Sequence, residues 1–238
     1  MADEPYDLWY WPEIPGRGEF VRLALEAGGI AYRDRAREEG SEALVKDMRA
    51  RLGERPFAPP YLLIGDHCLA QTANILLYLG DHHGVGLSRP YPRCFAHQLQ
   101  LTIADIVAEA HNVHHPVAMS AYYHDQKAEA ARAAKSFRAE RMPKFLGYFE
   151  AVLSDRGPWL AGERWSYVDL SLFQLIEGLR YAFPRRMKAL APTLPLSLAL
   201  RDRVAKLPEL ADYLSSERRI PFNQDGIFRH YPELDGEK

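Results

Sequence analysis

The sequence contains little cysteine: Cys68 and Cys94 are the only two in 238 residues, and no CxxC motif occurs. This excludes a disulfide framework and a structural zinc site built on cysteine, and it suits a reducing compartment. No apolar run is long enough for a signal peptide or a membrane span. We therefore expect a soluble, cytoplasmic protein.

The chain also lacks an excess of charge of either sign, since 30 Lys and Arg stand against 32 Asp and Glu. A net charge of −2 gives no electrostatic surface for nucleic acid or for an anionic membrane. The 47% of hydrophobic residues is an ordinary value for a globular protein. We expect partners that are small molecules or proteins, with no nucleic acid and no membrane.

The first third of the chain, residues 1–83, predicts an α/β domain. An aromatic strand at 6–11 is followed by a helix from Gly16 to Gly28, whose apolar residues recur with helical spacing. The remaining predicted elements are a weak strand near 30–35, a helix near 41–52, strands at 60–64 and 67–70, and a helix closing near Gly80.

Glycine and proline gather at residues 84–92, which predicts a linker. Residues 93–238 contain helical patterns only, at about 93–120, 125–154, 167–183 and 197–217. Strands followed by helices indicate an α/β domain and then an all-α domain. The tail, 218–238, is irregular but aromatic, so we expect it to pack back on the body.

Two motifs indicate a ligand site. Pro59 and Pro60 precede a predicted strand, where proline lacks the N–H that a ladder needs. Either a cis bond before Pro60 leaves backbone groups facing a ligand, or this is an ordinary loop diproline.

Thr72 is placed to cap the next helix. The Thr72 hydroxyl, the free N–H groups of the first turn and the neighbouring Gln71 amide could together form an anion site for a carboxylate; a plain helix cap is the alternative.

Two further patterns indicate structure more than chemistry. Ser166 and Asp169 have the spacing of a capping box, whose role is in folding. His111 and His115 stand at i and i+4 on a predicted helix, a spacing used by metal sites, with His114 between them. Since a suitable third ligand is not evident, we expect no metal, and pocket-lining or surface histidines are the alternative.

Three segments in the right order resemble glutathione transferases. The run from Pro60 to Thr72 is similar to the family's cis-proline strand and helix start. Tyr10-Trp11 followed by Gly16-Arg17-Gly18-Glu19 resembles the tyrosine-type branch, the Sigma, Mu and Pi classes, and Trp159–Asp169 resembles the family's buried capping segment. The resemblance implies a thioredoxin-like N-terminal domain, a C-terminal helical bundle domain, and a detoxifying homodimer with glutathione as co-substrate.

By this resemblance Tyr10 is the catalytic residue. Its hydroxyl would donate a hydrogen bond to the thiolate of glutathione, whose free pKa is near ~8.5. A core tyrosine of an aromatic strand is the alternative. The turn Trp11–Pro15 is about one residue longer than usual, which could displace the hydroxyl. Tyr6 shares the strand face but lies near the strand start.

The resemblance also implies the glutathione-binding residues. Gln71 and Thr72 would hold the γ-glutamyl carboxylate, and Lys46 the glycyl carboxylate. Pro59 and Pro60 would meet the cysteinyl backbone, but Pro59 has no N–H, so we expect one bond to be lost or compensated, at about 0.5–1.5 kcal/mol.

An acid from the partner subunit would reach the γ-glutamyl amine across the dimer. Asp105 and Glu109 match that region at i and i+4 on one helix face. We favour Glu109 of the two. A solvated acidic helix face is the alternative.

The electrophile would bind between the two domains, where small-molecule pockets are common. We expect Trp11, Tyr122, Tyr123 and Phe222 to line this substrate pocket, although they could equally be core residues, and residues 226–231 could form a lid. Conjugation, isomerisation and peroxide reduction all use the same thiolate. The rival reading is a non-catalytic glutathione-fold protein that binds ligands or partners.

Overall fold

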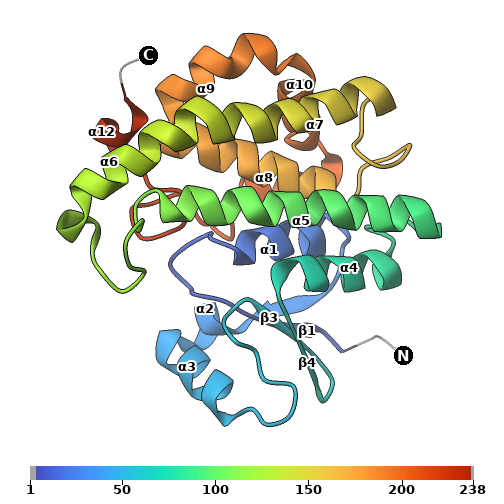
Figure 1. Ribbon diagram of the computed structural model, residues 1–238. Helices are drawn as coiled ribbons and strands as arrows, with labels where there is room; N and C mark the ends of the chain where they lie inside the picture. Colours follow the sequence, from blue (N-terminus) through green and yellow to red (C-terminus); the bar gives the residue numbers. More distant parts are fainter. Residues whose placement is uncertain (1–3, 237–238) are drawn as a thin grey trace.

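The computed structural model describes residues 4–236 and begins with a small mixed sheet (Figure 1). The strand order is β2-β1-β3-β4, in which β1 and β2 are parallel and the other neighbours antiparallel. The elements of this part are β1 (Tyr6–Trp9), α1 (Gly18–Ala27), β2 (Tyr32–Asp34), α2 (Arg35–Glu39), α3 (Ser41–Ala50), β3 (Tyr61–Ile64), β4 (His67–Ala70) and α4 (Thr72–His83). The predicted order is confirmed, with α2 as an unpredicted short addition.

The two faces of the sheet are covered by different helices because strand side chains alternate. Leu8 and Leu62 face the large core formed with α1 and α4. Trp9 and Tyr61 face the other way, into a small cluster with Ala36 of α2 and neighbouring residues of α3. Figure 1 shows α1 and α4 between the sheet and the helical half, with α2 and α3 on the far side.

The rest of the described chain forms no strand and folds around one central helix, α8 (Tyr167–Ala182), which contacts α1, α5 and α10. Its apolar sequence is buried nearly all round, as a central helix requires. The other helices are α5 (Pro90–Asn112), α6 (Lys127–Ser136), α7 (Met142–Arg156), α9 (Pro184–Leu190), α10 (Pro195–Val204), α11 (Ala211–Leu214) and α12 (Pro232–Asp235). The α/β then all-α arrangement is therefore as expected.

Helix boundaries differ from the predicted ones where proline or backbone irregularity intervenes. The helix expected at 93–120 ends at Asn112, ahead of Pro116, and the one expected at 197–217 is broken before Pro208. A π-helical segment, Phe137–Arg141, joins α6 to α7. The expected linker is shorter than 84–92, since α5 begins at Pro90; the domain limits themselves stay a prediction.

The tail packs against the body, as expected. Ile227 and Phe228 are buried, and Phe228 lies so close to Gly178 of α8 that any side chain there would overlap its ring. The tail thereby covers one end of the central helix. Within residues 4–236, no helix combines the length and apolarity needed to cross a bilayer.

Candidate active site

Sheet register brings three predicted site residues to one edge. Tyr10 directly follows β1, Pro60 directly precedes β3, and Gln71 directly follows β4. In the ladder Trp9 pairs with Tyr61, which in turn pairs with Ala70. Because these partners are the end residues of their strands, Tyr10, Pro60 and Gln71 emerge side by side.

The hydroxyl of Tyr10 is held by the start of α1. The backbone N–H of Arg17 donates to its oxygen at 2.8 Å, and the side chain is 4% exposed. Burial raises the pKa of Tyr10 above its ordinary value, so the phenol is neutral at physiological pH. Since the Arg17 N–H occupies an acceptor site of the oxygen, the phenol proton is left to donate to a ligand.

Glycine at two positions allows this arrangement despite the long turn. A Cβ at Gly16 would lie 2.1 Å from the Tyr10 hydroxyl oxygen, and one at Gly18 would lie 2.5 Å from its ring. Gly16 also has φ +41°, which is unfavourable for other residues. The extra residue in the turn therefore does not separate Tyr10 from the helix start.

The diproline and the residue before α4 both have special backbones. The Pro59–Pro60 bond is cis, which confirms the first of the two readings of this motif. Gln71 has φ 70°, the only positive value outside glycine among residues 4–236. Non-glycine residues adopt this region at a cost of about 1–2 kcal/mol, and such strain gathers at functional sites.

The prediction that Thr72 caps α4 is wrong. Gln71 occupies the N-cap, since its carbonyl accepts the first helical bond from the Ile75 N–H at 2.9 Å. Thr72 is the first helical residue, and its buried hydroxyl finds no hydrogen-bond partner within residues 4–236. Its hydroxyl is instead available to a ligand at the positive end of the helix.

A cavity of about 310 Å³ lies beside this helix start. Arg17, Gln71 and Thr72 line it from one side, and His97 and Gln100 of α5 line it from the other. Arg17 connects the two parts of the site, because its backbone holds Tyr10 while the residue also borders the cavity. No sequence motif signalled His97 or Gln100, since their role depends on how α5 packs.

The two carboxylates on α5 differ in their contacts. Glu109 is held by Arg141 of the π-helical segment in a bidentate pair of 2.6 and 2.8 Å. Asp105 is exposed and forms no ion pair within the part of the chain described. Glu109 is thus engaged by Arg141 within its own chain, and which of the two carboxylates reaches another subunit stays a prediction.

Lys46 is not brought to the cavity. It lies on the exposed side of α3 and lines a shallow groove formed by α3 alone. Its assignment to the glycyl carboxylate stays a prediction.

The four aromatic residues expected in the substrate pocket differ in their surroundings, and their assignment to that pocket stays a prediction. Tyr123 is buried, stacks on Tyr231 at 3.8 Å between ring centroids, and donates its hydroxyl to Glu233. Phe222 stacks on Tyr181 of α8 at 5.3 Å. Both rings therefore hold the tail in place.

The other two aromatic residues are open to solvent. Trp11 is 37% exposed and Tyr122 is 72% exposed. Of the four, these two are the most exposed, while Phe222 is half-buried.

The three histidines form a compact cluster at the end of α5, with ring centroids 4.8 to 5.2 Å apart. His114 donates from Nε2 to the Ile227 carbonyl at 2.8 Å, and His115 from Nδ1 to the Ala121 carbonyl at 3.1 Å. Burial lowers the pKa of His111 to about 4 and of His114 to about 3, so both rings are neutral. Among residues 4–236, no group of three or more His, Cys, Asp or Glu side chains is placed to hold a metal ion.

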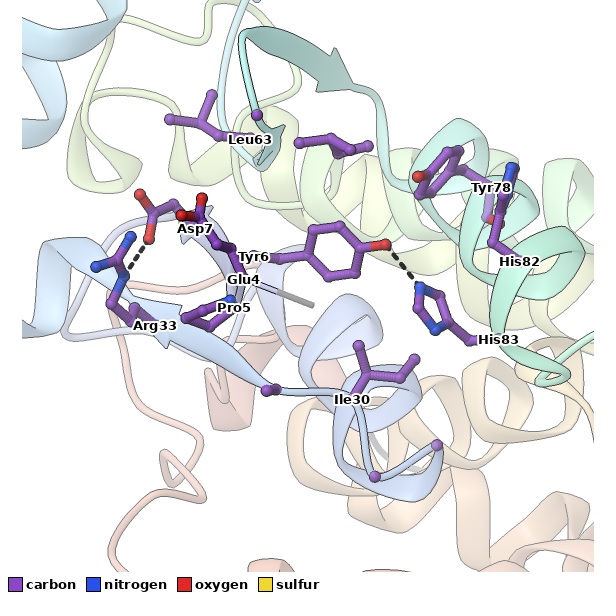
Figure 2. A pocket seen from close by; sticks show the side chains of 15 residues that line it. Glu4, Pro5, Tyr6, Asp7, Ile30, Arg33, Leu63, Tyr78, His82 and His83 are labelled. Atoms are coloured by element: carbon purple, nitrogen blue, oxygen red, sulfur yellow. Dashed lines mark hydrogen bonds and ion pairs between the residues drawn. The ribbon is translucent and has the colours of Figure 1, made fainter. Parts of the chain in front are cut away.

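Tyr6 belongs to a different part of the molecule. Figure 2 shows its hydroxyl pointing at His83 of α4, and the two atoms are 2.6 Å apart. These residues line a larger cavity, of about 890 Å³, at the opposite end of β1 from Tyr10. The geometry therefore separates Tyr6 from the edge that carries Pro60 and Gln71.

Known proteins resemble this chain over nearly its whole length. Residues 111–217 match the family described as "Glutathione S-transferase, C-terminal domain". A glutathione S-transferase of Plasmodium falciparum is 25% identical over 219 residues, 88% of this chain and 95% of the relative. Glutathione S-transferase Mu 2 of Rattus norvegicus is 27% identical over 224 residues, 90% of this chain and 92% of the relative.

A solved structure shows the same fold. The Pi-class glutathione S-transferase of Onchocerca volvulus superimposes with a TM-score of 0.71 at 19% identity, covering 94% of this chain and 99% of the other. The fold is thus a thioredoxin-like N-terminal domain followed by a helical C-terminal domain. The fold, the match over residues 111–217 and the full-length relatives together support a cytosolic glutathione transferase family for this chain.

Proposed function

We propose that this chain is a glutathione transferase in which Tyr10 activates the thiol for attack on an apolar electrophile. The observation that carries this is the Tyr10 hydroxyl, which accepts from the Arg17 N–H and keeps its own proton for donation. It emerges at the same sheet edge as the cis bond before Pro60 and the strained Gln71. A neutral phenol at that edge suits a developing thiolate.

The chemistry requires a lower thiol pKa. A thiol of pKa near ~8.5 is only a few per cent ionised at pH 7, and the thiolate is the nucleophile. One hydrogen bond from Tyr10 to the anion contributes roughly 1.5–3 kcal/mol, enough for one to two pKa units. The thiolate then attacks the electrophilic carbon and forms the carbon–sulfur bond, while the bond that breaks gives its electron pair either to a departing leaving group or, in an activated double bond, to the neighbouring carbon, which takes up a proton.

The remaining groups orient glutathione. The Pro59 carbonyl accepts the cysteinyl N–H, and the unpaired Thr72 hydroxyl, Gln71 and the helix N-terminus bind the γ-glutamyl carboxylate. Arg17 adds a cation at the same cavity. Lys46 is assigned to the glycyl carboxylate.

A homodimer completes this proposal. Phe57 is 93% exposed and Leu101 48% exposed, and apolar side chains left in solvent favour burial against a partner. Asp105, exposed on α5 near Leu101, would meet the γ-glutamyl amine of the partner's glutathione, in preference to the paired Glu109. The dimer is assigned to the cytoplasm, with a detoxifying role.

The test is the pKa of the bound thiol. Ultraviolet absorbance of the thiolate is followed against pH in a glutathione titration of wild type, Tyr10→Phe and Tyr6→Phe. We expect a pKa one to two units below ~8.5 in wild type and in Tyr6→Phe, and a return toward ~8.5 in Tyr10→Phe with loss of turnover. Binding without a shift in wild type would indicate the non-catalytic alternative.

A further inference from the structure

The cavity beside Thr72 contains polar atoms that the proposed carboxylate site does not use. Gln100 is 1% exposed, and its Oε1 atom has no hydrogen-bond partner within residues 4–236. His97, one turn earlier on the same face of α5, has a buried Nδ1 that is likewise unpaired. Buried polar atoms nearly always have a partner, so two of them facing one cavity indicate a polar ligand.

The two sides of this cavity have opposite hydrogen-bonding character. The side formed by Arg17, Thr72 and the helix start offers a cation and donors, which suit an anion. The α5 side offers the Gln100 carbonyl oxygen, which can only accept. Burial and the neighbouring Arg93 lower the pKa of His97, so its ring is neutral and one nitrogen can also accept.

A ligand that pairs with the donors on one side of the cavity and with the acceptors on the other carries an anionic group and a cationic hydrogen-bond donor a few bonds apart. The γ-glutamyl end of glutathione has this form, since its α-carboxylate and α-ammonium share one carbon. With the carboxylate at Thr72, the ammonium is left to find acceptors across the same cavity.

We infer that Gln100, assisted by His97, accepts hydrogen bonds from the γ-glutamyl ammonium of glutathione within its own subunit. This rests on the proposed function and adds to it a residue that selects the zwitterionic α-amino acid end. Recognition of the ammonium is then shared between the subunit's own α5 and an acid of the partner. Gln100 is a specificity-determining residue and takes no part in the chemistry at sulfur.

A comparison of two ligands tests the inference. The second ligand is glutaryl-cysteinyl-glycine, which is glutathione without its amino group, and dissociation constants are measured for both by calorimetry. Gln100→Met removes the acceptor at nearly constant volume, and Gln98→Met, on the exposed side of α5, is the matched control. We expect Gln100→Met to raise the dissociation constant of glutathione about tenfold and to leave that of the analogue unchanged. Gln98→Met should change neither dissociation constant.

Each other outcome is decisive. The inference is overturned if Gln100→Met weakens the binding of both ligands equally, or if it weakens the binding of neither. A second measurement uses the wild-type protein and so does not depend on the folding of a variant. The side-chain amide NMR signal of Gln100 should shift when glutathione binds and stay in place when the analogue binds. Identical shifts with both ligands also overturn the inference. If wild type binds neither ligand, the proposed function itself fails.

Discussion

Gly16 controls the position of the Tyr10 hydroxyl more directly than any other residue of the turn. An added Cβ would overlap the hydroxyl oxygen, and φ +41° is disfavoured for alanine. We therefore expect Gly16→Ala to lower the free energy of unfolding by about 2 kcal/mol and to displace Tyr10. Urea unfolding and the pKa of bound glutathione measure the two effects.

Gly147 supplies the control for that substitution. It lies in α7, is exposed, and an added Cβ would meet nothing within 4 Å. Gly147→Ala should stabilise the protein by about 0.5–1 kcal/mol, as alanine does in a helix, with the thiol pKa unchanged. If Gly16→Ala also left the thiol pKa unchanged, the role given to the turn would be wrong.

At the scale of elements, the capping box at the start of α8 fixes the backbone that leads into this helix. Asp169 accepts from the N–H groups of Ser166 at 2.9 Å and Leu160 at 2.8 Å, and it is completely buried. Asp169→Ala would leave these donors unpaired inside the protein. We expect it to lower the free energy of unfolding by about 2–4 kcal/mol, measured in urea, whereas the exposed Asp155→Ala should change it by less than about 0.5 kcal/mol.

Features set by nearby residues were predictable from the sequence, and features set by distant packing were not. The strand and helix order, the capping box and the sheet edge with Tyr10 and Gln71 follow from periodicity, turn residues and the family resemblance. The roles of His97 and Gln100 depend on how α5 packs beside α4. The stacking of Tyr123 on Tyr231 was not predictable either, because an aromatic residue of the interior and one of a pocket look alike in sequence.

At the scale of the whole molecule, α11 and the tail join the two halves through polar contacts. Arg219 pairs with Glu19 of α1, and the Tyr213 hydroxyl donates to the same carboxylate at 2.7 Å. Asn223 donates to the Glu13 carbonyl at 2.8 Å in the turn after Tyr10. The end of the chain therefore supports the segment that positions Tyr10, and loosening the tail should lower the stability of the protein and displace the Tyr10 hydroxyl.

His114 makes this attachment sensitive to acid. Its ring is buried and donates to the Ile227 carbonyl, and its pKa is lowered from 6.5 to about 3. Between these values the unfolded chain binds a proton that the folded protein does not, so stability is complete above about pH 6.5 and is lost as the pH falls. Between pH 7 and pH 5 this protonation of the unfolded chain lowers the free energy of unfolding by about 2 kcal/mol.

His114→Gln tests the assignment, because glutamine can donate to the same carbonyl but does not titrate. The variant should be less stable than wild type at pH 7, and the difference in unfolding free energy should narrow by about 2 kcal/mol at pH 5. His124→Gln, at a side chain that is 68% exposed, is the control for the substitution itself. A gap between His114→Gln and wild type that stays constant with pH would mean that the attachment of the tail does not depend on a neutral ring at this position.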